Sequence, residues 1–185
     1  NNITDVSSGS DSTGSPLFVA TVSNGDILFS SDGITWTKII STPNTKLNRV
    51  RYLNSIWWAV GNAGNVIKWN GDLSSTGWTV VSLGGNSTTV SGVDIAYNGT
   101  SYFISALGGF NATSANGNDN TWTIQSATGE TWQSVINVSA IFWAVGNGGI
   151  IKSSSDGTTW PPRPRMGSTR MAPIPSLPVA GPLSR

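Results

Sequence analysis

Side chains able to carry out acid–base or nucleophilic chemistry are few in this sequence. Its 185 residues include no histidine and no cysteine. This removes the commonest general base, the commonest metal ligand and the Ser–His and Cys–His catalytic pairings. Glu130 is the only glutamate, whereas glycoside hydrolysis needs two placed carboxylates. Tyr52, Tyr97 and Tyr102 therefore have no glutamate to activate them, and the sequence predicts no catalytic residue, no metal site and no cofactor.

Two pairs of residues are candidates for binding. Arg49 and Arg51 lie two apart and so share one face of a strand. A solvated position at a rim is favoured for them over an anion clamp. Trp57 and Trp58 suggest sugar stacking, but adjacent strand residues point to opposite faces, so a role in filling the core is favoured.

The composition indicates a polar but weakly charged surface. Charged residues make up 10% of the chain, against about 25% in an average soluble domain. Such a surface suits all-β proteins that are extracellular or bound to a particle, and it argues against long-range steering of a charged partner. We therefore expect a virion or extracellular location. No apolar run approaches the roughly 18 residues of a membrane helix, so membrane insertion is not expected.

The chain divides into three parts. Residues 1–16 are rich in Ser, Asp and Gly, and they predict an extended lead-in or a poorly formed outer strand. Residues 17–160 alternate short Val-, Ile-, Phe- and Trp-rich runs with Gly, Asn, Asp and Ser clusters, which is typical of strands and hairpins. Residues 161–185 are rich in proline, which cannot donate to a strand ladder, so an extended tail is predicted.

The middle part repeats a four-stranded antiparallel meander. Ile56–Lys68 returns as Ile141–Lys152, with an Ala-Val-Gly-Asn hairpin in both copies. The predicted strands are 17–22, 27–30 and 35–40; 48–53, 56–61, 65–69 and 78–83; 93–97, 101–106, 121–126 and 131–136; and 136–138, 140–145 and 150–153. Residues 108–120 are interpreted as an insertion in the third unit, and the first strand of the fourth unit is interpreted as shortened.

Two heptapeptides carry a recognisable motif. Ser30-Ser-Asp-Gly-Ile-Thr-Trp36 returns as Ser154-Ser-Asp-Gly-Thr-Thr-Trp160. Both resemble the Asp-box, or bacterial neuraminidase repeat, of β-propellers. The Gly-Asn-x-Gly hairpins are similar to those of photosystem assembly-factor propellers and of phage and giant-virus particle proteins. The resemblance implies an all-β, β-propeller-like array of about four antiparallel four-stranded blades, incomplete or open.

The motif is interpreted as structural rather than ligand-binding. An Asp at a tight turn accepts backbone hydrogen bonds, Gly supplies a positive φ, and the Trp packs into the blade. The residues assigned this role are Ser30, Asp32, Gly33, Trp36, Ser154, Asp156, Gly157 and Trp160. Residues 71–78 and 126–132 are interpreted as eroded copies. The tryptophans after each third strand are then Trp36, Trp78, Trp132 and Trp160, at uneven spacings of 42, 54 and 28 residues.

The favoured function is a non-enzymatic binding or assembly module on a virus or phage particle or another extracellular surface. Its expected partners are other protein subunits or further copies of itself, because an open array exposes edges that pair. A carbohydrate-binding lectin is the first alternative, with Phe110, Asn116 and Asp119 as ligand contacts in the longest loop. A sialidase-like hydrolase is the second, although the resemblance transfers no catalytic residue.

The basic tail is expected to take part in assembly. Residues 161–185 hold four arginines and no acid, whereas residues 1–160 hold nine acids and six bases. We expect Arg163, Arg165 and Arg170 to pair with acidic groups on the open edge or on a neighbouring subunit. Nucleic acid is the less favoured partner, because no aromatic residues are interleaved with these arginines.

Overall fold

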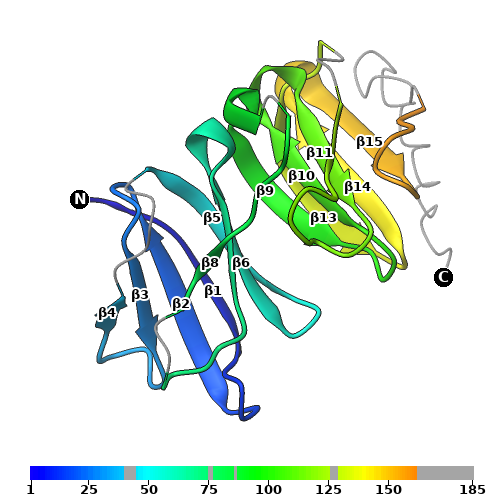
Figure 1. Cartoon of the computed structure of the whole chain (residues 1–185). Coiled ribbons are helices and arrows are strands. Elements are labelled where there is room, and N and C mark those ends of the chain that lie inside the picture. The colour runs from blue at the N-terminus through cyan, green and yellow to red at the C-terminus, as the bar shows by residue number, and fades with distance from the viewer. Residues whose placement is uncertain (40–44, 75–76, 86, 126–128, 162–185) are drawn as a thin grey trace, which may run out of the picture.

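The computed structural model describes residues 1–39, 45–74, 77–85, 87–125 and 129–161. Within them the chain forms four consecutive antiparallel sheets, here called blades 1 to 4, whose strands pair in chain order (Figure 1). Blade 1 holds β1 (Ile3–Ser10), β2 (Pro16–Val22), β3 (Ile27–Ser30) and β4 (Thr37–Ile39); blade 2 holds β5 (Leu47–Leu53), β6 (Ile56–Gly61), β7 (Val66–Trp69) and β8 (Thr79–Val80); blade 3 holds β9 (Gly92–Tyr97), β10 (Tyr102–Ala106), β11 (Asn111–Ser114) and β12 (Thr123–Gln125); and blade 4 holds β13 (Trp132–Val138), β14 (Ile141–Gly146) and β15 (Ile150–Ser154).

Helical structure in the described residues is limited to four single turns. These 3₁₀ turns are η1 (Asn62–Gly64), η2 (Ser87–Thr89), η3 (Leu107–Gly109) and η4 (Asn147–Gly149). Three of them join the second strand of a blade to the third, and each includes a residue with positive φ, such as Gly148 at 70°. No helix in the part of the chain that the structure describes is long and apolar enough to cross a membrane.

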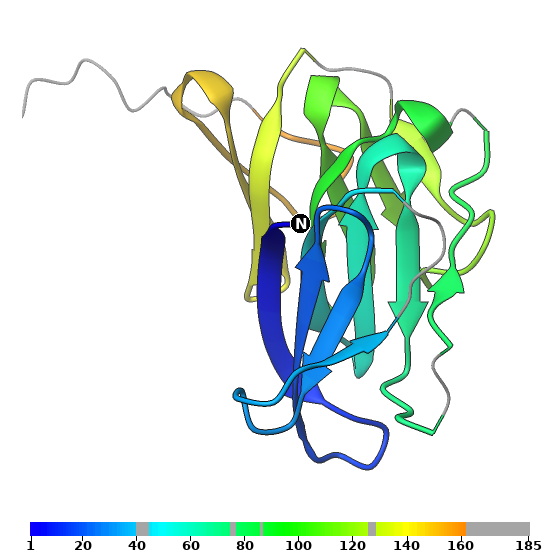
Figure 2. The ribbon, with the colours of Figure 1, turned by 90° about the vertical axis from the view of Figure 1, so that its left-hand side faces the viewer.

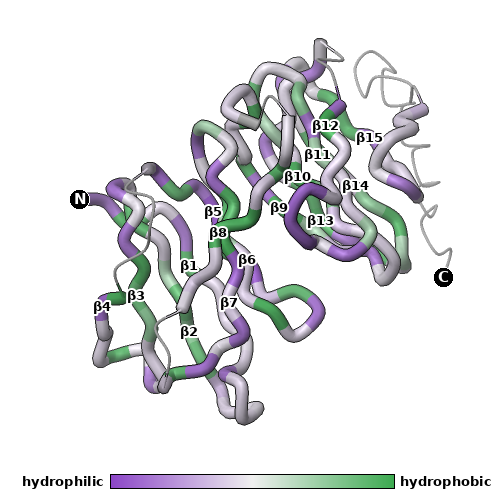
Figure 3. Tube along the Cα trace, viewed as in Figure 1, coloured by the Kyte–Doolittle hydropathy of each residue, from purple (hydrophilic) through white to green (hydrophobic). Residues whose placement is uncertain are grey.

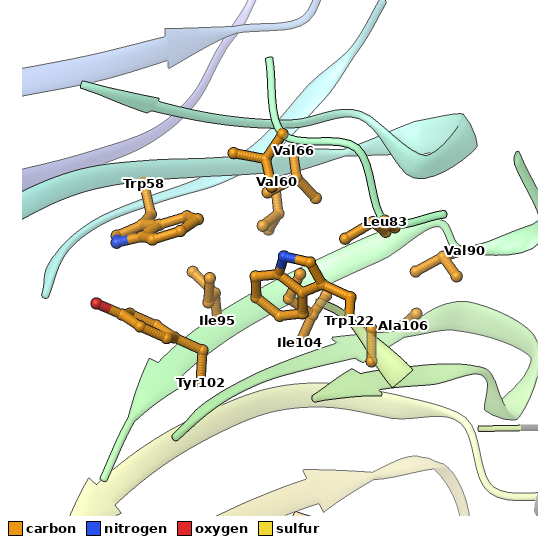
Figure 4. Packing of buried hydrophobic residues seen from close by; sticks show 12 residues of the cluster. Trp58, Val60, Val66, Leu83, Val90, Ile95, Tyr102, Ile104, Ala106 and Trp122 are labelled. Atoms are coloured by element: carbon orange, nitrogen blue, oxygen red, sulfur yellow. The ribbon is translucent and has the colours of Figure 1, made fainter. Parts of the chain in front are cut away.

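The blades pack face to face, and a separate hydrophobic cluster fills each of the three spaces between them. The cluster between blades 2 and 3 is built around Trp58, Tyr102 and Trp122 (Figure 4). Hydrophobic and hydrophilic residues are interleaved along the chain (Figure 3), whereas the second strands β6 and β10 are buried along nearly their whole length, because blades cover both of their faces.

The first strands of successive blades, β1, β5, β9 and β13, contact one another along the array. We call them the inner strands. Blade 1 and blade 4 lie at opposite ends of the row in Figure 1, and Figure 2 looks onto the blade 1 end of this row, with the blue strands in front. The prediction of an all-β, open array of about four antiparallel blades is confirmed.

The structure assigns several strands differently from the sequence prediction. Residues 3–10 are not a lead-in but form β1, which pairs along its whole length with β2 and makes blade 1 four-stranded. Residues 108–120 are not a simple insertion, because they contain β11. β11 has the sequence Asn-Ala-Thr-Ser, whose small and polar side chains gave no hydrophobic signal.

This correction shifts the remaining strands by one place. The segment predicted as the third strand of blade 3 is its fourth, β12, and the segment predicted as the fourth is β13, the first strand of blade 4. β13 has seven residues, so the first strand of blade 4 is not shortened. Among the described residues blade 4 has three strands, and the predictions for residues 162–185 lie outside the described part of the chain.

Candidate functional site

The two Ser-x-Asp-Gly turns have nearly identical hydrogen bonding. In blade 1, Ser30 Oγ accepts the N–H of Gly33 at 2.9 Å, and Asp32 Oδ1 accepts the N–H groups of Ile34 and Thr35, both at 2.8 Å. Trp36 Nε1 donates to the carbonyl of Gly33 at 3.3 Å. In blade 4 the corresponding bonds are formed by Ser154, Asp156, Gly157 and Trp160. Each carboxylate is used to hold its own turn.

Blade 3 contains a third turn of this kind that the sequence analysis missed. Ser114 Oγ accepts the N–H of Gly117 at 2.9 Å, and Asn116 Oδ1 accepts the N–H of Asn118 at 3.0 Å. Asn116 thus stands where the other turns have aspartate, and Trp122 follows as the aromatic residue. The sequence does contain this turn as Ser-x-Asn-Gly followed by Thr-Trp, but a motif that requires aspartate does not match it.

The tryptophans that follow the third strands are therefore Trp36, Trp78, Trp122 and Trp160, at spacings of 42, 44 and 38 residues. Trp132, previously counted in this series, is instead the first residue of β13. In the corresponding turn of blade 2, Asn70 Oδ1 accepts the N–H of Asp72 at 3.1 Å and Asp72 Oδ1 accepts that of Ser74 at 2.9 Å. Every blade thus closes its outer turn with a side-chain oxygen.

The Asp32 turn gives a prediction for low pH. Hydrogen bonds from the backbone N–H groups of Thr35 and Ile34 lower the pKa of Asp32 from 3.8 to about 2. Because the pKa of Asp32 is lower in the folded state, its ionised side chain stabilises the fold at pH values above the ordinary pKa of 3.8. This contribution is lost as pH falls through about 2. Asp32→Asn keeps the acceptor oxygen but removes the charge. We expect the variant to be less stable than the parent at pH 5 and the gap in Tm to close by pH 2.

Thermal unfolding between pH 2 and pH 5 measures this gap. Asp11 is the matched control, because its pKa is also lowered, first by the Thr13 hydroxyl, but it lies in the β1–β2 turn. The double variant with Asp11→Asn should widen the gap at pH 5. Parallel Tm curves for the parent and Asp32→Asn over the whole range would rule out the proposed role of the Asp32 charge.

A charged network runs along the inner strands. Arg51 contacts Asp5 of β1 at 3.1 Å and Asp94 of β9 at 3.1 Å, and Arg49 lies 3.5 Å from each of the same carboxylates. Asp94 is fully buried and also accepts the Ser134 hydroxyl at 2.7 Å. The expectation of a solvated rim position for Arg49 and Arg51 is wrong, because both are partly buried and hold three blades together.

Backbone hydrogen bonds reinforce this network. Asp5 Oδ2 accepts the N–H of Val50 at 3.0 Å, and Asp94 Oδ2 accepts the N–H of Val135 at 3.2 Å. In both cases the carboxylate of one blade binds the inner strand of the next. The arginines are thus neutralised within the fold and offer no free anion site.

The three residues predicted as lectin contacts are not brought together. Phe110 precedes β11 and lines a pocket of about 680 Å³ with Leu83, Trp122 and Ile124. Asn116 and Asp119 lie beyond the other end of β11. Asn116 holds the turn described above within blade 3. Asp119 Oδ1 accepts the N–H of Ser82 at 3.0 Å and so joins blade 3 to the segment that follows β8.

The other candidates for chemistry are also engaged in the fold. Trp57 and Trp58 are both buried. Glu130 forms an ion pair with Lys152. Burial raises the pKa of Tyr102, which packs against Trp58. Among the described residues, no group of three or more Asp or Glu side chains is placed to hold a metal ion.

Blade 4 exposes an apolar face at the end of the array. Val135, Ile136, Val138, Trp143, Val145 and Ile151 line a groove of about 500 Å³ on it, together with Ser134. We call the part formed by Ile136, Trp143, Val145 and Ile151 the trailing face. Contiguous exposed apolar surface of this kind marks an interaction site in soluble proteins.

Repeated sequence shows what this surface does elsewhere in the chain. Val145 pairs with Ile151 across β14 and β15, as Val60 pairs with Val66 across β6 and β7. Val60 and Val66 are buried against blade 3, whereas Val145 and Ile151 are each 43% exposed. The difference is that no blade follows blade 4 among the described residues.

Comparisons with known proteins identify the fold. No family model matches the chain, and no curated protein matches it. Among solved structures, the β-propeller domain of Cps50 (Swd1) from Myceliophteria thermophila has a TM-score of 0.57 at 12% identity, over 79% of this chain and 48% of its own. The fold is that of an open β-propeller-like array.

Two further structures show the same relation. The computationally designed Ika8 protein matches with a TM-score of 0.64 at 13% identity, over 85% of this chain and 47% of its own. YCF48 bound to D1 peptide matches with a TM-score of 0.56 at 17% identity, over 78% and 48%. The chain therefore spans about half the length of these three propeller-like chains.

Proposed function

We propose that this open propeller is a non-enzymatic assembly module that binds another protein surface through the exposed face of its last blade. The observation that carries the proposal is the trailing face, whose residues Val145 and Ile151 are exposed while Val60 and Val66, their counterparts in blade 2, are buried. Burial of apolar surface is worth about 25 cal/mol per Å². Burial of the trailing face by another protein, to the extent that Val60 and Val66 are buried, would therefore supply a large part of a binding free energy.

A protein partner fits this face better than a glycan or a nucleic acid. The groove on blade 4 is lined almost entirely by aliphatic side chains and Trp143, with Ser134 as its polar residue. YCF48, which shares the fold, is bound to a peptide in its solved structure. Both arginines on the inner strands are paired with aspartate, so no phosphate-binding strip is formed by them.

We assign the module to a virus or phage particle or another extracellular surface. Support comes from the low content of charged residues, 10%, and from the abundance of polar uncharged residues that replace them. We also propose that the Ser-x-Asp-Gly turns of blades 1 and 4 are Asp-boxes and that the Ser-x-Asn-Gly turn of blade 3 is a variant of them, since all three share one hydrogen-bond pattern. No specific contact among the described residues favours the lectin or the hydrolase.

The proposal predicts that polar substitutions on the trailing face abolish association. Val145→Asp and Ile151→Asp place a carboxylate in an interface that excludes water, at a cost of several kcal/mol per buried charge. We expect the purified parent chain to associate, and each variant to remain at its chain mass of about 19.3 kDa. Light scattering across a concentration series measures the mass.

Ile34→Asp is the matched control. Ile34 is an even more exposed aliphatic residue, but it lies on the outer turn of blade 1 rather than on an open face. Its variant should associate like the parent, and circular dichroism should show the same strand content for all chains. A parent chain that stays monomeric at every concentration, with its trailing face accessible, would contradict the proposed function.

A further inference from the structure

We infer that the trailing face binds blade 1 of a second copy of this chain, so that two chains close into a ring of eight blades. This inference rests on the proposed function and names its partner. The receiving surface, here called the leading face, is the outward side of blade 1, where Val6 is exposed and Phe18 and Leu28 are partly exposed. The argument depends on the three blade-to-blade interfaces that the chain already contains.

The trailing face is one half of such an interface. In blade 2, Trp58, Val60 and Val66 pack against blade 3 in one continuous cluster (Figure 4). The strands of blade 4 place Trp143 two residues before Val145, and Val145 pairs with Ile151, in the register that blade 2 uses. Blade 4 therefore presents the surface against which a following blade packs.

The leading face is the other half. Within each blade, one residue of the inner strand lies across from the second strand and points to the preceding blade: Val6 opposite Ala20, Val50 opposite Ala59, Ile95 opposite Ile104 and Val135 opposite Ala144. Val50, Ile95 and Val135 are buried, but Val6 is 54% exposed. Blade 1 thus carries a β-branched residue suited to packing on a preceding blade, and the described residues contain no blade before blade 1.

Size and symmetry favour an assembly of two chains. The chain covers 47% of the Ika8 chain and 48% of the Swd1 propeller domain, so two copies supply about the length of either. A two-fold axis makes both junctions identical, and a closed ring leaves neither end face exposed. A second copy is therefore the partner that satisfies both faces at once.

Engineered cysteines test the geometry directly, because the sequence contains none. Val6→Cys lies on the leading face and Val145→Cys on the trailing face, and both parent side chains are about half exposed, so the variants should fold. We expect light scattering to give about twice 19.3 kDa for the parent chain. Mild oxidation should then convert the double variant into a disulfide-linked dimer on a non-reducing denaturing gel.

The single variants supply the controls. Neither alone should cross-link, whereas an equimolar mixture of the two, exchanged before the oxidant is added, should give a covalent heterodimer. Cross-linking of Val145→Cys with itself would overturn the inference by showing that two copies of blade 4 pack together. Filaments or larger open assemblies would overturn ring closure while leaving the assembly function intact.

A monomeric parent would overturn the inference in two distinguishable ways. If the thiol of Val145→Cys is protected from maleimide in a monomer, then the trailing face is covered by the chain itself, and the partner is not a second copy. If that thiol reacts at the rate of a free cysteine in a monomer, then nothing covers the face, and the proposed function fails as well.

Discussion

Asp94→Ala is expected to destabilise the chain by about 3–5 kcal/mol, because it leaves two arginines without their buried partner. The Asp94 side chain is inaccessible to solvent and contacts Arg51 at 3.1 Å. It also accepts the Ser134 hydroxyl at 2.7 Å and the N–H of Val135 at 3.2 Å. One substitution therefore weakens the contacts of blade 3 with both of its neighbours. Urea unfolding followed by tryptophan fluorescence measures the loss.

Asp5→Ala is the matched control for this prediction. Asp5 contacts the same two arginines but is more exposed and lies at the end of the array, where it joins only blades 1 and 2. We expect its loss to cost less than half as much. Asp94→Asn should fall between the two, since the amide keeps an acceptor oxygen but no charge. A loss below about 1 kcal/mol for Asp94→Ala would show that the network contributes little to stability.

The repeat made the fold class predictable from the sequence. The strands of blade 3 could not be assigned correctly in the same way. Apolar runs such as Ile56–Gly61 and Ile27–Ser30 predicted strands that the structure contains with the same bounds. β11 was missed, and β1 was predicted only as a lead-in or a poorly formed outer strand, because each is rich in Ser, Thr, Asn or Asp. β11 is nevertheless buried throughout, since small side chains allow two blades to approach closely. A hydrophobic pattern cannot predict a strand that is buried because its small side chains allow close packing, rather than because its side chains are large and apolar.

The candidate site was less predictable than the fold. Arg51 and Asp94 are 43 residues apart, and their contact depends on the stacking of β5 against β9. Spacing within one strand placed the two arginines on the same face but could not reveal their partners. The trailing face was also hidden, because Val60 and Val145 occupy the same position in the same repeat. Only the order of the blades makes one buried and the other exposed.

Trp58→Ala is expected to cost about 3–5 kcal/mol, the range for a large aromatic removed from a packed core. Trp58 lies 4.8 Å from Tyr102 and 6.1 Å from Trp122 between ring centroids, and it shares one cluster with Val60 and Ile104. The space it leaves cannot collapse easily, because rigid blades line it on both sides. We expect the lost packing between blades 2 and 3 to lower the midpoint of urea unfolding.

Trp36→Ala separates this core effect from the loss of any tryptophan. Trp36 is 37% exposed on the outer turn of blade 1, and its indole donates only to the carbonyl of Gly33. We expect its replacement to cost about 1 kcal/mol, the value of one hydrogen bond and a partial loss of contact. Equal losses for the two variants would mean that the outer turns, rather than the clusters between blades, determine stability. The larger loss at Trp58 would instead show that each blade depends on its neighbour, which is the physical reason why the uncovered end of such an array needs a partner.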